Sequence, residues 1–581
     1  MSRLAPLLWL LAATACSSDP PETGPDAGVD ATVPADAYVD LSGPVFLPDH
    51  IVEVAITMAP ADWDALRVQT RTFGSVIEGK CLSQPAPSPF TTYHASITID
   101  GTTIADVGIK KKGFFGSLDP DKPSLKIKLD EFVAGVEYLG LEKLTLNNSH
   151  QDPAFVRQCL SYQIFGGAGI VVPRCNFAHV RVNGQDLGVY VNVETIDHHL
   201  TKKRYADGTG GLYEGTLSDF RKDWLGTFDA KGAGDGSELK ALAAVVDNAP
   251  DATLVADLSA HIDVDRFMTY WATEILTNHW DGYANDHNNF FVYHDPTTSK
   301  LDFIPWGPDG ALQPGATFGP LGSTSGPVAV AARGALAYRL FALSATRQQF
   351  LDRQRSLLAT TWNETALLAE IDRMEALITP IANAAQGTAW HATVGEVRQF
   401  VTGRRAALTA ALDAGPTWTD PLPRYPCLET VAHVSGTFNT TFGTIGAADP
   451  FVTGSGTMSI TIGGTTTVLS PVGAKAGFDP NPPMGTQANA VVQVFGVRAS
   501  DNHIIAVSMA VPPGIFFPRT AKLGFFDSSG MVFDYNPGTN MTSLVGYMLG
   551  DLQLAQASTG TNAPVSGSFS ANADVQGTPP P

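Results

Sequence analysis

Basic residues are scarce in this 581-residue chain: 37 lysines and arginines stand against 57 acidic residues, for a formal net charge of −20. Without an excess of cations to neutralise phosphates and release counterions, the chain is unsuited to bulk nucleic-acid binding. The shortage does not exclude a single nucleotide, which needs only one or two well-placed cations and a metal ion.

Cysteine is also scarce, with five in the chain, and this limits the zinc sites that can be built. One is Cys16, and the other four, Cys81, Cys159, Cys175 and Cys427, match no C-x-x-C zinc pattern. In an oxidising compartment four cysteines permit two disulfides, with three possible connectivities. Cys159 with Cys175 is the most local pairing, but the sequence does not choose among them.

Long apolar runs are missing apart from LAPLLWLLAATA at 4–15, which is too short to span a bilayer as a stable helix. Arg3 precedes this run and Cys16 follows small residues, as in an export signal. LAATAC resembles a bacterial lipobox, in which Cys16 is lipidated after cleavage; an ordinary cleaved signal is the alternative. We therefore expect an exported cell-envelope protein whose only membrane contact is a lipid on Cys16.

The rest of the chain divides by composition and periodicity into a tether and two folded parts. The tether, 17–43, is rich in Pro, Asp and Ala and has too little apolar surface to fold, so it is predicted to be disordered. We predict an α+β domain at 44–420 that opens with strands and ends with three amphipathic helices in 335–413. Their apolar stripes are interpreted as the core of a C-terminal helical subdomain. Short alternating runs then predict an all-β, sandwich-like domain at 428–575.

Acids and amides gather around a predicted β-hairpin in NHWDGYANDHNNFFVYHDPTTSKLDFIPWGPDG. Asp281 and Asp286 precede the Asn288–Asn289 pair, and Asp309 follows the second strand. Phosphoryl transfer uses this set: one carboxylate orients the acceptor hydroxyl, while an amide and a later carboxylate hold Mg²⁺. Taken alone, the same residues can simply cap and turn around a hairpin.

Two further segments offer candidate phosphate-binding groups. In GIKKKGFFGSLDPDKPSLKIKL, a loop with Gly113 and Gly116 lets backbone N–H groups approach phosphates, and Lys126 on the next strand could reach them. Lysines on an amphipathic strand more often face water. The hairpin in NGQDLGVYVNVETID ends at Glu194, which becomes interesting only as a partner for such a lysine or a metal.

The ordered set of motifs resembles the CotH kinase family, secreted bacterial proteins named after spore coat protein H. The resemblance covers roughly residues 45–415 and rests on these segments, in order: DWDAL, KGFFGSLDPDKPSLKIKL, DPAFVRQCL, VNGQDLGVYVNVE, NHWDGYANDHNNFFVY and IPWGPDG. The order of the set is far more specific than any single motif.

The resemblance implies an atypical protein-kinase-like fold that uses ATP and Mg²⁺ or Mn²⁺ to phosphorylate Ser or Thr of a protein substrate. It makes Lys126 the phosphate-contacting lysine, Asp281 the catalytic acid with Asp286 as a rival, and Asn289 and Asp309 the metal ligands. The chain departs from the family pattern at one point. Where the family has Trp-Asp-x-Asp, this chain has Gly307 in place of the first acid.

Two other functions compete with a kinase. The Gly307 substitution and the β domain favour a catalytically inactive surface lipoprotein that binds a ligand. A metal-dependent hydrolase built on His279, Asp281, Asp286 and His287 is the second alternative, although no HExxH motif is present. The His198–His199 pair is interpreted as a solvated turn. GSTSG at 322–326 has Thr at the nucleophile position of a serine-hydrolase elbow, which disfavours that class.

Overall fold

The computed structural model describes residues 39–71, 82–114, 117–314, 328–423, 428–447, 449–480, 488–524 and 528–576. The predictions for Cys16, Cys81, Gly116, Cys427 and 322–326 lie outside these ranges. The chain divides into two compact units, one formed by residues up to 67 and 83–423 and the other by 68–82 and 424–581. Across the part that the structure describes, no helix combines the length and the apolar character needed to cross a bilayer.

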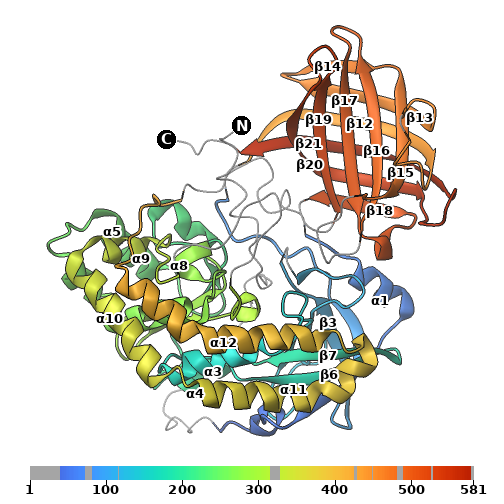
Figure 1. Cartoon of the computed structure of the whole chain (residues 1–581). Helices are drawn as coiled ribbons and strands as arrows, with labels where there is room; N and C mark the ends of the chain where they lie inside the picture. Colours follow the sequence, from blue (N-terminus) through green and yellow to red (C-terminus); the bar gives the residue numbers. More distant parts are fainter. Residues whose placement is uncertain are drawn as a thin grey trace. The chain divides into compact units, whose positions relative to one another are not determined.

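A closed barrel forms the first part of unit 1 (Figure 1), with the strand order β1-β2-β3-β4-β5-β7-β6. Its strands are β1 (Ile51–Thr57), β2 (Tyr93–Ile99), β3 (Thr102–Lys111), β4 (Leu125–Lys128), β5 (Lys143–Asn147), β6 (Cys175–Val182) and β7 (Gln185–Val193). A short helix, α1 (Pro60–Arg67), follows β1.

The barrel follows from the alternation in the sequence. Leu125 and Ile127 on β4 are fully buried in the barrel core, whereas Lys126 and Lys128 between and after them are partly exposed. The predicted hairpin β6–β7 is confirmed, and Asn183 and Gly184 both have positive φ at its turn, as a two-residue hairpin with right-handed strand twist requires.

Two helices lie outside the barrel but in the same stretch of the chain as its strands. Helix α3 (Arg157–Gly167) is linked to the first residue of β6 by the Cys159–Cys175 disulfide, with the two Cα atoms 5.3 Å apart. Asp152 accepts a hydrogen bond from the backbone N–H of Arg157 at 2.8 Å, so it satisfies a donor at the start of α3. Helix α4 (His198–Arg204) follows β7.

The end of the predicted tether is ordered. Asp40 Oδ2 lies 3.0 Å from Arg174 Nη1, and Ser42 Oγ accepts a hydrogen bond from Arg174 Nη2 at 2.6 Å. Residues 39–43 therefore belong to unit 1, because a polar network offsets the small apolar surface of this segment.

The second part of unit 1 surrounds a four-stranded sheet of order β11-β10-β8-β9. Its strands are β8 (Leu212–Gly215), β9 (Asp229–Ala230), β10 (Phe290–Asp295) and β11 (Lys300–Pro305), and its first helices are α5 (Ser237–Asn248), α6 (Leu254–Ser259), α7 (Val264–Thr277) and α8 (Tyr283–Asp286). The β10–β11 hairpin is confirmed. Helices α6 and α7 are separate, because Asp263 accepts a hydrogen bond from the Arg266 N–H and starts a new helix.

Four helices, rather than the expected three, end the unit: α9 (Ala335–Ala342), α10 (Ser344–Thr360), α11 (Glu364–Gln386) and α12 (Trp390–Asp413). In Figure 1, α11 lies along β7, where a Cβ atom on Gly188 would stand 2.8 Å from Cβ of Ala385. The buried side chains of these helices join those of α3, α7 and β10 in one apolar cluster. Among the described residues the helices thus share the core of the unit and do not form a separate subdomain.

Unit 2 confirms the predicted all-β composition. Ten strands form one sheet of order β14-β13-β12-β21-β20-β18-β19-β17-β16-β15. Their bounds are β12 (Leu428–Thr441), β13 (Gly454–Ile462), β14 (Thr465–Leu469), β15 (Val472–Phe478), β16 (Ala490–Arg498), β17 (His503–Val511), β18 (Arg519–Gly524), β19 (Ser528–Asn536), β20 (Met541–Gln556) and β21 (Pro564–Gln576). The sheet curls so that β12–β14 contact β15 and β16, which encloses the apolar core between layers as in a sandwich.

Candidate functional site

A small polar pocket lies against the end of the barrel. Its walls come from three places in the sequence. They are the turn after β3, the segment where β5 ends and α3 begins, and the loops at the base of the β10–β11 hairpin. The lining residues are Lys112, Gly113, Ser117, Ser124, Asn147, Asn148, Gln158, Asn289, Gly307 and Asp309.

Lys112 is the basic residue of this pocket. It is 4% exposed, and its ammonium group donates to Oδ1 of Asn147, whose Nδ2 donates in turn to Oε1 of Gln158 at 3.0 Å. The ammonium also lies 5.5 Å from the ring centre of Trp306, the residue before Gly307. A buried cation held in this way is positioned to meet an anionic group in the pocket.

The side-chain amide of Asn148 joins two points of the loop between β3 and β4. Asn148 Nδ2 donates to the carbonyl oxygens of Ser117 at 3.0 Å and Lys122 at 2.8 Å. Gly113 has φ +129°, and a Cβ atom there would stand 2.5 Å from Oγ of Ser117. Only glycine fits this turn, so the backbone beside the pocket stays open to a ligand.

The segment between α7 and β10 carries the predicted acids. Asp281 is fully buried, and its two oxygens accept from Asn288 Nδ2 at 3.0 Å and Asn289 Nδ2 at 2.8 Å. Asp286 also hydrogen-bonds Asp281. Burial raises the pKa of Asp286 to about 7, and that hydrogen bond opposes the rise. Asp281, Asp286 and Asn289 are therefore brought together, and Asn289 stands between Asp281 and the pocket.

Two buried acids that do not line the pocket hold the segment between α7 and β10 in place. Glu274, near the end of α7, accepts from the backbone N–H groups of Tyr283 at 2.8 Å and Ala284 at 3.0 Å, the first two residues of α8. Asp219 accepts from the hydroxyl of Tyr283 at 3.0 Å and from the Ala335 N–H at 3.0 Å. The positions of Asp281 and Asn289 thus depend on acids that do not touch the pocket.

Asp309 reaches the pocket from the short 3₁₀ turn Pro308–Gly310, which packs on α3. Its pKa is raised to about 7, first by burial and then by the charge of Asp152, while the positive charge of Lys112 acts in the opposite direction. A cation beside Asp309 would favour its ionised form. Asn289 and Asp309 share this cavity.

Three other predicted site residues have different surroundings. Gly116 lies outside the described residues. Lys126 is not part of the pocket lining; it lies near Glu214 on β8, whose pKa its charge lowers against the dominant effect of burial. Glu194 lies 2.7 Å from Arg174 and also pairs with Lys203, so its carboxylate belongs to the network that holds the end of the tether.

Sequence reasoning missed Lys112, Asn147 and Gln158. Lys112 ends the run Lys110–Lys112 directly before the glycine turn, and this position next to a turn was the available signal. Asn147 is the last residue of β5 and lies on the same face of the barrel wall as Lys126 on β4. No sequence pattern marks Gln158, because only the packing of α3 brings it to the pocket.

The two histidines of the proposed metal-dependent hydrolase do not join Asp281 and Asp286 in a ligand set within the described residues. His287 Nε2 hydrogen-bonds the carbonyl oxygen of Arg333 at 3.0 Å, and burial lowers the pKa values of His279 and His287 to about 4. Within the described ranges, the single group of three His, Cys, Asp or Glu ligands at metal-binding separation lies elsewhere, at Glu142, His198 and His199. The geometry gives this hydrolase no support.

The chain is similar to a known protein family and to known proteins. The family model described as CotH kinase protein matches residues 109–408, more than half of the chain. Inner spore coat protein H of Bacillus subtilis is 26% identical over 182 residues, 29% of this chain and 49% of that protein. Invasin CotH3 of Rhizopus delemar is 26% identical over 174 residues, 27% of this chain and 29% of that protein.

The chain thus spans less than half the length of each of these two relatives. Among solved structures, the Helicobacter pylori proinflammatory kinase CtkA aligns with 51% of this chain and 92% of its own. The TM-score of 0.25 and the identity of 9% are too low to establish a common fold.

Proposed function

The chain belongs to the CotH kinase family, and on that premise we propose that it is an exported atypical protein kinase. It transfers the γ-phosphoryl group of ATP to Ser or Thr of a protein substrate, with Mg²⁺ or Mn²⁺. The observation that carries the proposal is that Lys112, Gly113, Asn289 and Asp309 line one pocket. These are the group types that phosphoryl transfer needs: a cation, an open backbone and oxygen ligands for a metal.

The residues present fit a magnesium ion. Mg²⁺ takes oxygen ligands, keeps several waters, and is usually held by one or two carboxylates together with substrate phosphates. The Asn289 amide and the Asp309 carboxylate would supply the protein oxygens. The ion would neutralise charge on the phosphates, as it does in other kinases.

The chain's own groups would then position the phosphates and the acceptor. Lys112, kept in place by Asn147, would place a positive charge next to the phosphates. The backbone at Gly113 lets them approach closely. Asp281 lies behind Asn289, so its contact with an acceptor hydroxyl requires the segment to rearrange when substrate binds, as apo kinase-type sites often do.

Export and a lipid anchor on Cys16 form the second part of the proposal, supported by the residues before 43. The kinase would then act on proteins of the cell envelope or surface. The alternative is an inactive surface-binding lipoprotein, and one observation favours it. Gly307 replaces the first family acid, and a Cβ atom there would lie 2.8 Å from Asn289 Oδ1.

One experiment separates the two functions. The purified chain is heated with and without millimolar Mg-ATP, and transfer from γ-labelled ATP to casein or to the chain itself is measured. A kinase shows a raised melting temperature and labelling, because a nucleotide bound only by the folded state stabilises it. Asp281→Ala and Asp309→Ala should each abolish labelling. No thermal shift and no labelling would leave the surface-binding function.

A further inference from the structure

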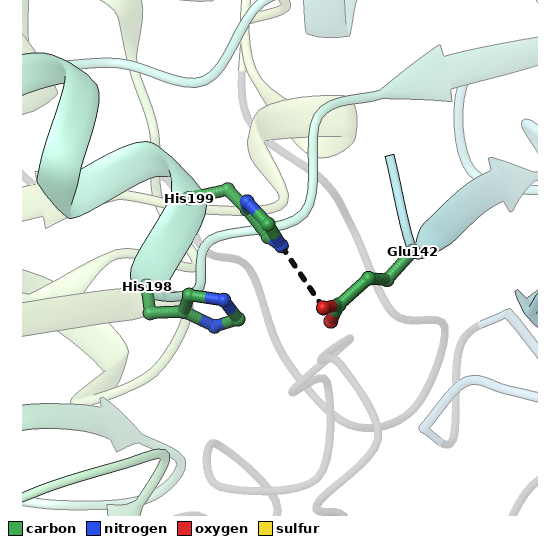
Figure 2. A group of neighbouring side chains, drawn as sticks. All are labelled: Glu142, His198 and His199. Atoms are coloured by element: carbon green, nitrogen blue, oxygen red, sulfur yellow. Dashed lines mark ion pairs between the residues drawn. The ribbon is translucent and has the colours of Figure 1, made fainter. Parts of the chain in front are cut away.

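Glu142, His198 and His199 meet on the barrel (Figure 2), where β5 begins and α4 begins. Glu142 immediately precedes β5, and the two histidines open α4, which follows β7, the neighbour of β5 in the barrel. His199 Nε2 lies 3.5 Å from Glu142 Oε1, and the two imidazole centres are 3.9 Å apart. One ligand atom from each residue lies within 4.8 Å of the other two.

These side chains form a ligand set for a transition metal. Two imidazoles and one carboxylate, with a fourth position for water, are typical of zinc sites, whereas Mg²⁺ and Ca²⁺ prefer oxygen. Tetrahedral bonds of roughly 2.1 Å would put ligand atoms about 3.4 Å apart, so modest side-chain rotations would close the set around an ion. Glu142 and His199 are half-buried and His198 is more exposed, which leaves the site open to an aqueous ion.

The backbone around the three side chains is already fixed. Asp197 accepts from the His199 N–H at 3.0 Å and caps α4, while the carbonyl oxygen of Glu142 accepts from the Leu129 N–H at 2.7 Å. Two positive charges oppose a cation here, those of Lys143 and Lys202. The ammonium of Lys143 lies 3.6 Å from Asp197, which compensates it. Ligands held on fixed backbone lose little entropy when they close on a metal.

A simpler interpretation is an ordinary ion pair between Glu142 and His199. The second histidine argues against it, because an ion pair needs one imidazole and this site presents two. Elsewhere in the unit His391 pairs with Glu375, and the other ion-pair partner of that Glu375 is Arg398. This pair has the same chemistry as Glu142 with His199 but lacks a second histidine, so it provides a matched control.

We propose that Glu142, His198 and His199 bind one divalent transition-metal ion, of which Zn²⁺ is the representative, with water in the remaining position. The site is distinct from the kinase pocket. Glu142 and the pocket residue Asn147 lie at opposite ends of β5, about 16 Å apart along the strand. Bound metal would tie the start of α4 to the start of β5 and stabilise that edge of the barrel. The proposal goes beyond the kinase function and does not depend on it.

The test uses the full chain without an affinity tag, stripped of metal by a chelator and titrated with Zn²⁺ against a chromogenic competitor. We expect one Zn²⁺ per chain and a higher melting temperature with the ion than without it. His198→Ala with His199→Ala should weaken binding by at least about 100-fold, since even outer-shell changes cost 10–100-fold. His391→Ala should bind as the unaltered chain does. Asp309→Asn should retain this site even if it loses kinase activity.

Equal Zn²⁺ affinity in the unaltered chain and the double variant would overturn the proposal, as would the absence of binding to the unaltered chain. Glu142→Gln, which keeps the size of the side chain and removes its charge, should weaken Zn²⁺ binding, and its own metal-free melting temperature is the reference for the smaller rise that Zn²⁺ gives. If the double variant fails to fold, the site is tested instead with Cu²⁺ bound to the unaltered chain. Hyperfine coupling to two imidazole nitrogens in its EPR spectrum supports the site, and a spectrum without nitrogen coupling rejects it.

Discussion

Gly307 and Asn289 pack so closely that a Cβ atom on residue 307 would stand 2.8 Å from Oδ1 of Asn289. Gly307 has φ +51°, its N–H donates to the hydroxyl of Tyr162 at 3.2 Å, and Asn289 Nδ2 lies 3.4 Å from its carbonyl oxygen. The missing acid of the family motif has therefore been replaced by direct packing of Asn289 against the backbone. Any side chain at 307 must move the amide that we assign to the metal.

Gly307→Ala should weaken Mg-ATP binding by about 10-fold or more, because the new methyl group displaces Asn289 and brings no oxygen ligand of its own. Mg-ATP affinity is measured by thermal shift or calorimetry. Gly463→Ala is the matched control: its φ is +55° and a Cβ atom there meets nothing within 4 Å. Both variants carry the strain of a left-handed residue, so unchanged affinity in Gly307→Ala would remove Asn289 from the proposed metal site.

Lys112, rather than Lys126, should prove to be the lysine that matters for phosphate binding. Lys112→Met keeps most of the length of the side chain and removes a positive charge that lines the pocket. The rate of phosphoryl transfer should therefore fall by about 100-fold or more, as it does when one electrostatic group is lost from a preorganised site. Transfer rates of Lys112→Met, Lys126→Met and Lys128→Ala are compared. Lys128 is the control, because it pairs at 3.5 Å with Glu131 at the surface. A larger loss in Lys126→Met than in Lys112→Met would restore the prediction made from the sequence.

The difference between these two lysines shows what the sequence could predict. Hairpins depend on local residues, so the Asn183–Gly184 turn and the alternation of β4 were readable directly. Which lysine lines the pocket depends on how the barrel closes and on where the β10–β11 hairpin packs against the barrel. These are contacts between segments more than 140 residues apart in sequence, such as Gly307 with Tyr162. Periodicity along one strand carries no information about them.

The same limit explains Glu194 and Glu274. Glu194 looked like an exposed acid after a strand, yet Arg174, 20 residues earlier, and Lys203 surround it. Glu274 is an acid inside an apolar helix, and no pattern in the sequence relates it to the site. Its partners are the backbone N–H groups of α8. Every residue except proline has such a group, so the sequence does not show which of them Glu274 binds. The start of α7 is different, because Asp263 is a residue type that commonly caps helices, and the sequence therefore predicts this helix start.

Glu274 should act as a positioning residue for the site. Glu274→Ala leaves the buried N–H groups of Tyr283 and Ala284 without their acceptor, at about 1–3 kcal/mol each, so the melting temperature and the transfer rate should both fall. Glu274→Gln keeps one oxygen acceptor and should lie between. Glu364→Ala, which removes an acid from an exposed pair with Arg405, is the control and should cost less than about 1 kcal/mol. If Glu274→Ala loses stability but keeps the full transfer rate at permissive temperature, Glu274 serves the fold alone.

Stability should depend on pH through Asp119, in the loop beside the pocket. Burial by itself raises the pKa of this carboxyl, but hydrogen bonds from His150 and from the backbone N–H groups of Lys122 and Asp121 outweigh it and lower the pKa to about 2. Because the folded-state pKa lies below the ordinary 3.8, the stability that the carboxylate contributes is fully present above about pH 4. It is lost as the pH falls through about 2.

Urea unfolding of the unaltered chain and of Asp119→Asn should therefore show a difference in free energy that is constant from pH 7 to about pH 5 and shrinks as the pH falls towards 2. Asparagine keeps an oxygen for the Asp121 and Lys122 N–H groups but cannot carry the charge that faces His150. Asp352→Asn, at an exposed position on α10, corrects for the loss of one negative charge from the whole molecule. A difference that stays constant down to pH 2 would mean that the Asp119 carboxylate contributes its hydrogen-bonding oxygens but not its charge. The loop at the pocket would then be held mainly by Asn148.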